Sequence, residues 1–295
     1  MKFTLTGSLG NIGKPLTEIL IKAGHELTVI SNEPDMKAKI EALGAKAAIG
    51  SVTDIAFLTN SFPSADAIYT MMPYNFGVTN YRQYVAGIGN NYAAAIKASG
   101  VKRVVNLSSI GAHLENGTGS ITGLHDVEQI LNQLDDVAVK HLRPAIFYIN
   151  FFFDIALIKG QNMMGNNYGK EARLVMAHPG DIATVAASEL QQSFTDKSYR
   201  YVVSDEQRIS DIVKIPGTAI GKTELPWVRF TDEQTFAGMT MAGMMPPAIA
   251  KLYVELGTAI DKGILWEDYD RNKPETLGNT KLADFAKEFA VVFNN

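Results

Sequence analysis

The chain contains no cysteine. This absence excludes disulfide bonds, thiolate catalysis and zinc sites with thiolate ligands. The sequence also lacks an excess of basic residues, because 27 Lys and Arg face 31 Asp and Glu and the formal net charge is −4. No basic field is therefore present to attract nucleic acid or an anionic membrane surface, and we expect neither as a partner. His, Asp and Glu do not recur at metal-ligand spacing, so we expect no metal site.

Long apolar runs are missing as well. The longest run, 145–158, is interrupted by Asn150 and Asp154 and is shorter than the roughly 18–20 residues of a membrane span. The N-terminus has no charged lead followed by an apolar core, so we expect no signal peptide and a cytoplasmic protein. A hydrophobic content of 46% over 295 residues is sufficient for a nucleotide-binding domain with a smaller lobe.

A glycine-rich turn is the most informative feature that is present. An apolar run over 3–5 leads to Gly7, Gly10 and Gly13, and a one-sided helical pattern follows. Gly7 can adopt backbone angles that a Cβ forbids, and Gly10 allows phosphates to approach the main chain. Gly13 permits close packing of the helix, whose free N–H groups and dipole then face the anion. This order of strand, turn and helix predicts a site for a nicotinamide dinucleotide.

Apolar runs and helical patterns alternate through the first half of the chain, which predicts a parallel sheet covered on both faces. The expected strands are 3–5, 26–31, 46–50, 65–73, 101–109, 137–145, 172–177 and 199–203. The expected helices are 12–23, 36–45, 54–62, 81–99, 126–134, 181–192, 209–221, 233–243, 247–262 and 281–293.

We therefore expect a Rossmann-type, doubly wound α/β fold with a smaller, mostly helical C-terminal lobe. The nucleotide-binding domain is predicted over 1–150, with its sheet completed by 175–204. The substrate lobe is predicted to combine 151–174 with 205–295, packed over the carboxyl ends of the strands, where ligands bind in such sheets.

Several stretches match a known family: "TGSLGNIG" at 6–13, "AIGSVTD" at 48–54, "VVNLSSIG" at 104–111, "LRPAIFYIN" at 142–150 and "PGDIATVAA" at 179–187. On these motifs the chain resembles the NmrA-like group of atypical short-chain dehydrogenases. That group includes type 2 NAD(P)H:quinone oxidoreductases and triphenylmethane reductases. The resemblance extends over nearly the whole chain.

One departure concerns the catalytic Tyr-x-x-x-Lys of short-chain dehydrogenases. Its expected place, 120–131, reads "SITGLHDVEQIL" and contains neither Tyr nor Lys. Alcohol oxidation and sugar-nucleotide epimerisation then lack their base. His113 and His125 flank this segment, but a lone His is more often a surface or capping residue than a catalyst. No catalytic residue is assigned from the sequence.

The resemblance implies a set of cofactor-binding residues along the carboxyl edge of the sheet. They are Thr6, Gly7, Ser8, Gly10, Asn11, Ile12, Gly13, Ser31, Asn32, Ser51, Met71, Met72 and Pro73. The family often has Arg at the position of Ser31, where it accepts the 2′-phosphate of NADP. Ser31, Asn32 and Lys37 can still bind a phosphate, whereas Glu33 can serve the ribose of NAD. We favour NADP, with NAD as the alternative.

Three residues are predicted to contact substrate: Tyr74, Tyr148 and Asn150. Tyr74 follows the fourth strand, together with Phe76. Tyr148 lies at the end of the sixth strand, where it is expected to stack on an aromatic substrate or donate a proton. Asn150 has a structural alternative, the capping of nearby backbone groups. Core packing is likewise the alternative for Met71, for Met72 and for the Met-rich stretch at 236–253.

Together these features predict an NAD(P)H-dependent oxidoreductase that transfers hydride to a quinone-like or other flat electrophilic acceptor. Such acceptors need no strong general acid, so positioning supplies most of the catalysis. The alternative is a non-catalytic NAD(P)-sensing regulator of the NmrA type, which would act on a protein partner. Either form is compatible with a homodimer. A sugar-nucleotide epimerase is disfavoured by the missing base.

Overall fold

The computed structural model describes residues 1–243 and 245–295. Its centre is a seven-stranded sheet in the order β10-β6-β5-β4-β1-β2-β3, in which every pair of neighbours is parallel. The strands are β1 (Lys2–Leu5), β2 (Glu26–Ser31), β3 (Lys46–Ile49), β4 (Ala67–Thr70), β5 (Arg103–Leu107), β6 (Ala138–Pro144) and β10 (Lys197–Val202). The order reverses between β1 and β4, which defines the switch point at which such sheets bind ligands.

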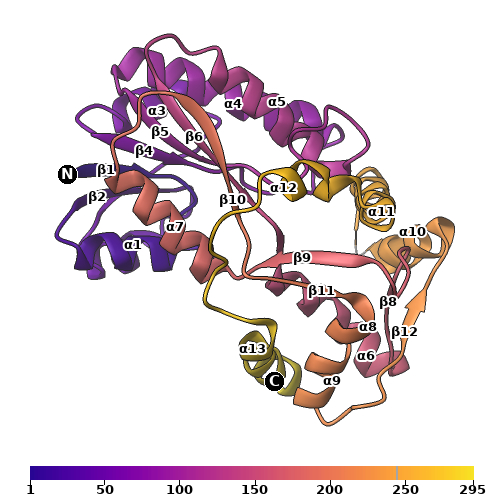
Figure 1. Ribbon diagram of the computed structural model, residues 1–295. Helices are drawn as coiled ribbons and strands as arrows, with labels where there is room; N and C mark the ends of the chain where they lie inside the picture. The colour runs from indigo at the N-terminus through magenta and orange to yellow at the C-terminus, as the bar shows by residue number, and fades with distance from the viewer. Residues whose placement is uncertain (244) are drawn as a thin grey trace.

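Helices cover both faces of this sheet (Figure 1). One face carries α1 (Gly13–Lys22) and α7 (Pro179–Gln191), and the other carries α3 (Ile55–Ser61), α4 (Tyr81–Ser99) and α5 (Thr122–Asn132). A short helix, α2 (Met36–Ala42), connects β2 to β3. The predicted doubly wound Rossmann-type fold, with a smaller and mostly helical C-terminal part, is confirmed.

The local sequence explains the ends of α4. Asn80 accepts a hydrogen bond from the N–H of Gln83 and so caps the first turn. Gly100 ends the helix with φ +75°, a conformation that a side chain disfavours. Both signals are local, and the helix spans the 81–99 that the sequence predicts.

The remaining strands form two small sheets. One contains β7 (Ile146–Phe147), β9 (Arg173–Ala177) and β11 (Asp205–Arg208), and the other pairs β8 (Met164–Asn166) with β12 (Trp227–Arg229). Of the two strands expected within 175–204, β10 lies at the edge of the central sheet, whereas β9 pairs with β7 and β11. The domain bounds themselves stay a prediction.

Short helices accompany these small sheets, mostly at the lower right of Figure 1. They are α6 (Ile155–Gln161), α8 (Ile209–Ile212), α9 (Lys214–Ala219), α10 (Asp232–Thr240), α11 (Pro247–Lys262), α12 (Glu267–Arg271) and α13 (Leu282–Asn294). Single 3-10 turns are η1 (Gly119–Ile121), η3 (Met241–Gly243) and η4 (Ile264–Trp266), and η2 (Tyr148–Asp154) is longer. Within the Met-rich stretch at 236–253, residue 244 lies outside the described residues.

A buried carboxylate attaches the C-terminal segment to the sheet. Asp181, at the start of α7, accepts hydrogen bonds from the Ser204 hydroxyl at 2.6 Å and the Thr280 N–H at 3.1 Å. A side chain at Gly278 would collide with Asp181, so the chain passes close to it there. These contacts fix the path of the chain between α12 and α13.

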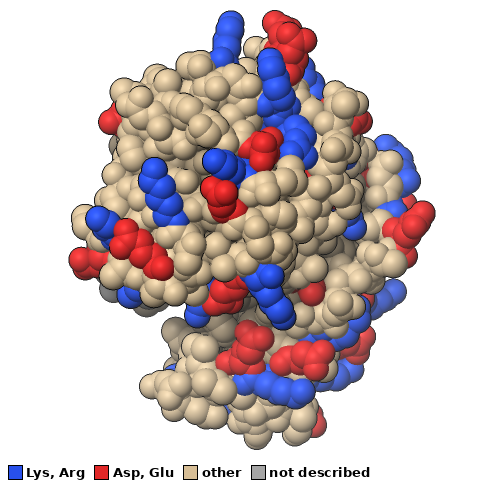
Figure 2. All heavy atoms as spheres, turned by 90° about the vertical axis from the view of Figure 1, so that its left-hand side faces the viewer, with Lys and Arg blue, Asp and Glu red and all other residues tan. Residues whose placement is uncertain are grey.

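The surface shows no segregation of charge on the face drawn in Figure 2. Lys and Arg alternate there with Asp and Glu, without a patch of one sign. Among the helices described, none combines the length and the apolar character that a membrane span needs.

Candidate functional site

The glycine turn forms a tight cradle between β1 and α1. Gly7 has φ +94°, and a Cβ there would lie 2.6 Å from Cγ of Met71. A Cβ on Gly13 would overlap the carbonyl oxygen of Ser8. Both positions therefore require glycine, one for conformation and contact and the other for the close approach of helix and turn.

Gly10 differs, because its outer side is open. A Cβ added there would meet only the carbonyl oxygen of Gly7, at an ordinary 3.5 Å. Beyond it, the N–H groups of Asn11, Ile12 and Gly13 find no main-chain acceptor within the described parts of the chain. Free N–H groups at the start of a helix bind anions. The cradle thus fits the diphosphate of a dinucleotide, which these residues would hold.

Thr6 links this cradle to the loop after β4. Its N–H donates to the carbonyl of Tyr69 at 3.0 Å, and its hydroxyl accepts from the N–H of Met71 at 2.9 Å. The Tyr92 hydroxyl donates to the Met71 carbonyl at 2.8 Å. Met72 is buried in the core beneath. The backbone beside the switch point is therefore fixed, and the Met71 side chain lies against Gly7.

Ser31 ends β2 and is buried. Its hydroxyl accepts hydrogen bonds from the Ser8 hydroxyl at 3.0 Å and from the Glu33 N–H at 3.1 Å, and its carbonyl accepts from Gly50. Ser31 thus joins the glycine turn to the turn after β2. Four exposed residues follow in that turn: Asn32, Glu33, Pro34 and Asp35.

Two further predicted cofactor residues differ in their surroundings. The Ser51 hydroxyl is engaged with Thr53 in its own turn, at 2.7 Å from the Thr53 hydroxyl. Pro73 is half-buried near the start of the loop after β4. The structure therefore brings the predicted residues of β1, α1, β2 and the β4 loop to one edge of the sheet. Ser51 lies on the outer side of that edge, after β3.

A buried ion pair occupies the region where short-chain dehydrogenases carry their Tyr and Lys. Glu128 of α5 accepts two hydrogen bonds from Arg143 of β6, at 3.0 and 2.6 Å, and a third from the Ser108 hydroxyl at 2.5 Å. Arg143 also reaches Asp268 of α12 at 3.3 Å, and Asp268 accepts from the Tyr201 hydroxyl. Burial opposes the charge on Arg143, but the hydrogen bond and charge of Glu128 outweigh it and raise its pKa.

Sequence reasoning missed this network. Its signal was Arg143 within the strand expected over 137–145, since charged residues are rarely buried unless they are paired. The network engages the Ser108 hydroxyl, and it supplies no residue with the role of the absent Tyr or Lys.

The two histidines beside this region, His113 and His125, have different hydrogen-bond surroundings. His125 contacts the Ala112 carbonyl through Nδ1 at 2.9 Å, which is a structural role. Both ring nitrogens of His113 are buried and lack a hydrogen-bond partner among the described residues. Burial lowers the pKa of His113, so the ring is neutral near pH 7.

Tyr148 does not line an open pocket, which corrects the expectation that its ring faces substrate. Its side chain is fully buried, its ring packs on Phe285 with centroids 5.3 Å apart, and its hydroxyl donates to the Thr280 carbonyl at 3.2 Å. Burial raises the pKa of this phenol, with a smaller contribution from nearby aspartates. Tyr148 therefore anchors the C-terminal segment and keeps its proton. Asn150, two residues later, is exposed.

Tyr74 is exposed over 66% of its surface, in the loop after β4. The side chain is therefore accessible to a ligand, and its contact with substrate stays a prediction.

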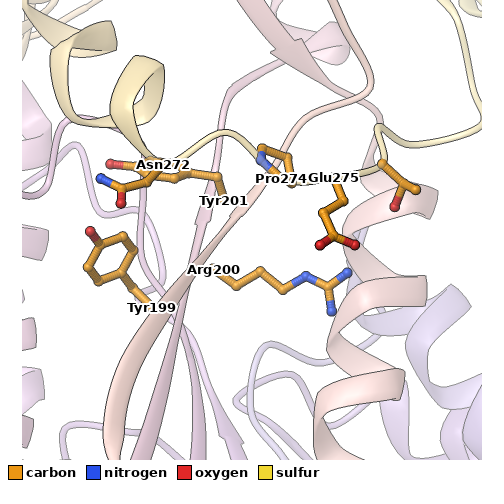
Figure 3. A pocket seen from close by; sticks show the side chains of 7 residues that line it. Tyr199, Arg200, Tyr201, Asn272, Pro274 and Glu275 are labelled. Atoms are coloured by element: carbon orange, nitrogen blue, oxygen red, sulfur yellow. The ribbon is translucent and has the colours of Figure 1, made fainter.

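Two cavities lie away from the glycine turn. The first, of about 410 Å³, is bounded by Tyr199, Arg200 and Tyr201 of β10 and by the segment that follows α12 (Figure 3). The Glu275 carboxylate points toward the side of the cavity that holds the Arg200 guanidinium, which is paired with Glu189 of α7 at 2.6 Å. None of the residues that line this cavity belongs to the glycine turn or to the loop after β4. The cavity therefore does not continue the cofactor edge.

The second cavity, of about 500 Å³, is lined by Trp227 and by residues of 169–172, with Arg229 and Asp261. Arg229 and Asp261 pair with each other at 2.7 Å. It lies among the small sheets, away from the switch point.

Comparison with known proteins agrees with this geometry. Residues 7–141 match the model of an NAD(P)H-binding domain family. No curated protein matches the chain in sequence.

Solved structures match over nearly the whole chain. An NADPH-dependent quinone oxidoreductase from Escherichia coli, complexed with NADPH, has a TM-score of 0.83 at 18% identity, over 97% of this chain and 99% of that one. Triphenylmethane reductase from Citrobacter sp. gives 0.82 at 16% identity, over 99% and 100%. A Staphylococcus aureus protein described as a nucleoside-diphosphate-sugar epimerase gives 0.81 at 15%, over 97% and 100%. These likenesses establish the fold, and the domain match shows an NAD(P)H-binding domain over 7–141.

Proposed function

We propose that this chain, whose residues 7–141 match an NAD(P)H-binding domain, is an oxidoreductase that reduces a quinone-like or other flat electrophilic acceptor. The observation that carries the proposal is the open cradle at Gly10. There, free N–H groups at the start of α1 face outward while Gly7 and Gly13 are sterically required. The structures with the same fold include two reductases, which supports the reaction class.

Hydride transfer to such an acceptor requires the protein to position the two reactants and needs no strong general acid. The bound dinucleotide supplies a hydride, and a quinone that gains this hydride and one proton becomes a hydroquinone. The proton comes from water, because the Tyr148 hydroxyl is bonded to Thr280 and the Ser108 hydroxyl to Glu128. This chain's residues would hold the two reactants in line and exclude other geometries.

We further propose NADPH as the preferred cofactor. Support comes from the folds that match: the quinone oxidoreductase is complexed with NADPH and triphenylmethane reductase with NADP(H). In this chain Asn32 and Lys37 are exposed beyond β2 and are available to a 2′-phosphate, whereas Ser31 is occupied by internal hydrogen bonds. Glu33 is exposed in the same turn and opposes this preference through its charge.

A second candidate is a regulator that binds NAD(P) without turnover, and one observation is compatible with it. The Ser108–Glu128–Arg143 network occupies the region where catalytic residues of short-chain dehydrogenases lie, and it holds every one of those groups in an internal contact. A regulator needs the cofactor site alone and a surface for a protein partner. The network thus distinguishes this chain from alcohol dehydrogenases and epimerases, which need a catalytic base. It does not distinguish a regulator from a reductase that only holds its two reactants in place.

Steady-state oxidation of NADPH and NADH with a panel of quinones tests the proposal. The reductase predicts acceptor-dependent loss of nicotinamide absorbance well above the protein-free rate. Tight binding of NADPH by calorimetry, with no turnover across the panel, would establish the regulator instead. Matched titrations with NADH report the cofactor preference.

A further inference from the structure

Five aromatic side chains converge at the loop after β4. Tyr74 and Phe76 belong to the loop, with ring centroids 5.9 Å apart. Tyr81 and Tyr84 come from the first turn of α4, and their rings are 6.3 Å apart. Tyr253 belongs to α11, and burial together with the nearby Tyr74 phenol raises its pKa. Aromatic groups from the nucleotide-binding part and from the C-terminal part therefore meet here.

Tyr74 is held in a fixed orientation but remains open on one side. Its ring lies nearly parallel to that of Tyr81, at an interplanar angle of 18° and a centroid separation of 6.3 Å. Tyr81 is buried at 7% exposure, whereas Tyr74 is exposed over 66% of its surface. The Tyr74 ring thus lies beside the buried Tyr81 ring, and most of the Tyr74 surface stays exposed.

Phe76 lies next to Tyr74 and is also exposed. It is exposed over 36% of its surface, and its ring is tilted by 53° to that of Tyr74. We call this pair of tilted, exposed rings the notch. A flat ring stacked on Tyr74 would meet Phe76 in the tilted arrangement that aromatic pairs favour.

The notch lies close to the cofactor cradle. Met71, whose side chain lies against Gly7, precedes Tyr74 by three residues, a reach of at most about 11 Å along the chain. β4 belongs to the half of the sheet that also contains β5 and β6. This half lies on the opposite side of the switch point from β2 and β3. Since a dinucleotide spans both halves with its adenosine over β2, the notch is on the nicotinamide side.

The charge around the notch is balanced. Arg82, next to Tyr81, donates two hydrogen bonds to Asp126, at 2.6 and 2.7 Å. Its guanidinium is therefore engaged and is not offered to an anionic ligand. A neutral, flat ring system suits such a surface better than a carboxylate or phosphate.

We infer that Tyr74 and Phe76 form the acceptor-binding notch of this protein and select neutral acceptors with two or more fused rings over one-ring acceptors. This inference rests on the proposed reductase function. In the offset stacking that aromatic pairs favour, a one-ring quinone overlaps only part of the Tyr74 ring, whereas a fused ring system overlaps the whole ring. The fused system also extends toward Phe76 and adds contacts there that a one-ring quinone cannot make.

The test compares 1,4-benzoquinone with 9,10-phenanthrenequinone, with NADPH as donor. The wild-type protein is expected to have the lower KM for phenanthrenequinone. Tyr74→Ala is expected to raise the ratio of the phenanthrenequinone KM to the benzoquinone KM about tenfold. Phe76→Ala is expected to raise this ratio by a smaller factor, about threefold. Tyr74→Phe, which keeps the ring, is expected to restore most of the preference.

Tyr199→Ala is the matched control, because Tyr199 is also an exposed tyrosine but lies on β10. Three strand spacings, about 14 Å, separate β10 from β4. The inference is overturned if Tyr74→Ala leaves the ratio unchanged, or if Tyr199→Ala changes it as much.

Calorimetric binding of phenanthrenequinone separates this inference from the proposed function. Loss of binding in Tyr74→Ala without turnover in the wild type would retain the notch and overturn the reductase. Turnover in the wild type with the same quinone affinity in wild type and Tyr74→Ala would retain the reductase and overturn the notch. Failure of the wild type to bind phenanthrenequinone at all would also overturn the notch.

Discussion

Replacement of Gly10 by valine separates cofactor binding from folding more cleanly than any other change at the glycine turn. A Cβ at this position has only the Gly7 carbonyl as a near neighbour, at 3.5 Å, and the backbone does not have positive φ. The change in unfolding free energy without ligand should therefore stay within about 1 kcal/mol. The side chain would instead occupy the space through which a diphosphate reaches the N–H groups of α1.

The expected loss of affinity follows from hydrogen-bond geometry. A phosphate oxygen must come within about 3 Å of the N–H groups, which leaves no room for two γ-methyl groups beside it. Loss of two such contacts corresponds to about 2.8 kcal/mol, or a hundredfold increase in Kd for NADPH. At an NADPH concentration of about 100 times the wild-type Kd, the wild type would gain roughly 2.7 kcal/mol of stability and the variant roughly 0.4.

Calorimetric titration and thermal unfolding, each with and without NADPH, measure these two quantities. Gly87→Val is the matched control, because Gly87 lies in α4 with open space around it and should not alter Kd. Gly13→Ala provides the contrast, since its Cβ overlaps the Ser8 carbonyl and should destabilise the unliganded protein. A folded Gly10→Val protein with wild-type affinity for NADPH would refute the phosphate assignment.

Three further predictions concern charge. Arg143→Met should destabilise the protein by about 3–5 kcal/mol, because it leaves buried Glu128 unpaired, and adding Glu128→Gln should recover part of the loss in denaturant unfolding. Asp154→Asn should stabilise at pH 8 but not at pH 4. Burial raises the pKa of Asp154 to about 7, so the folded state retains a proton that the unfolded state loses, and wild-type stability falls between about pH 4 and 7; parallel melting curves would contradict this. Glu33→Gln should improve the affinity for NADPH relative to NADH about threefold, and an unchanged ratio would show that Glu33 does not face the ribose.

The glycine turn was predictable from the sequence because its requirements are local. Gly7 needs its φ of +94° and Gly13 needs contact with a carbonyl five residues earlier. The ends of α4 are set in the same way, by Asn80 and Gly100. Neither requirement depends on distant parts of the chain, so a short pattern is enough to reveal each.

Tyr148 shows where such reasoning fails. The sequence places it at the end of a strand, where ligands often bind, but its burial depends on Phe285 and Thr280 more than 130 residues away. The partner of Glu128 is likewise set by the register between β5 and β6, which places Arg143 over α5. Strand alternation gives the face on which a side chain lies but not what packs against it.

The cofactor site and the proposed acceptor site also differ in how far they depend on distant parts of the chain. The cofactor cradle is made of backbone from one continuous segment, Thr6–Gly13, with Ser31 and Met71 as supports, so its shape depends on few distant contacts. The proposed acceptor notch consists of two side chains of the β4 loop, Tyr74 and Phe76, and exposed rings such as Tyr74 can be replaced at little cost to folding. A fold of this kind can therefore keep its cofactor while its acceptor changes, and the experiments that test for an acceptor belong at the notch rather than at the cradle.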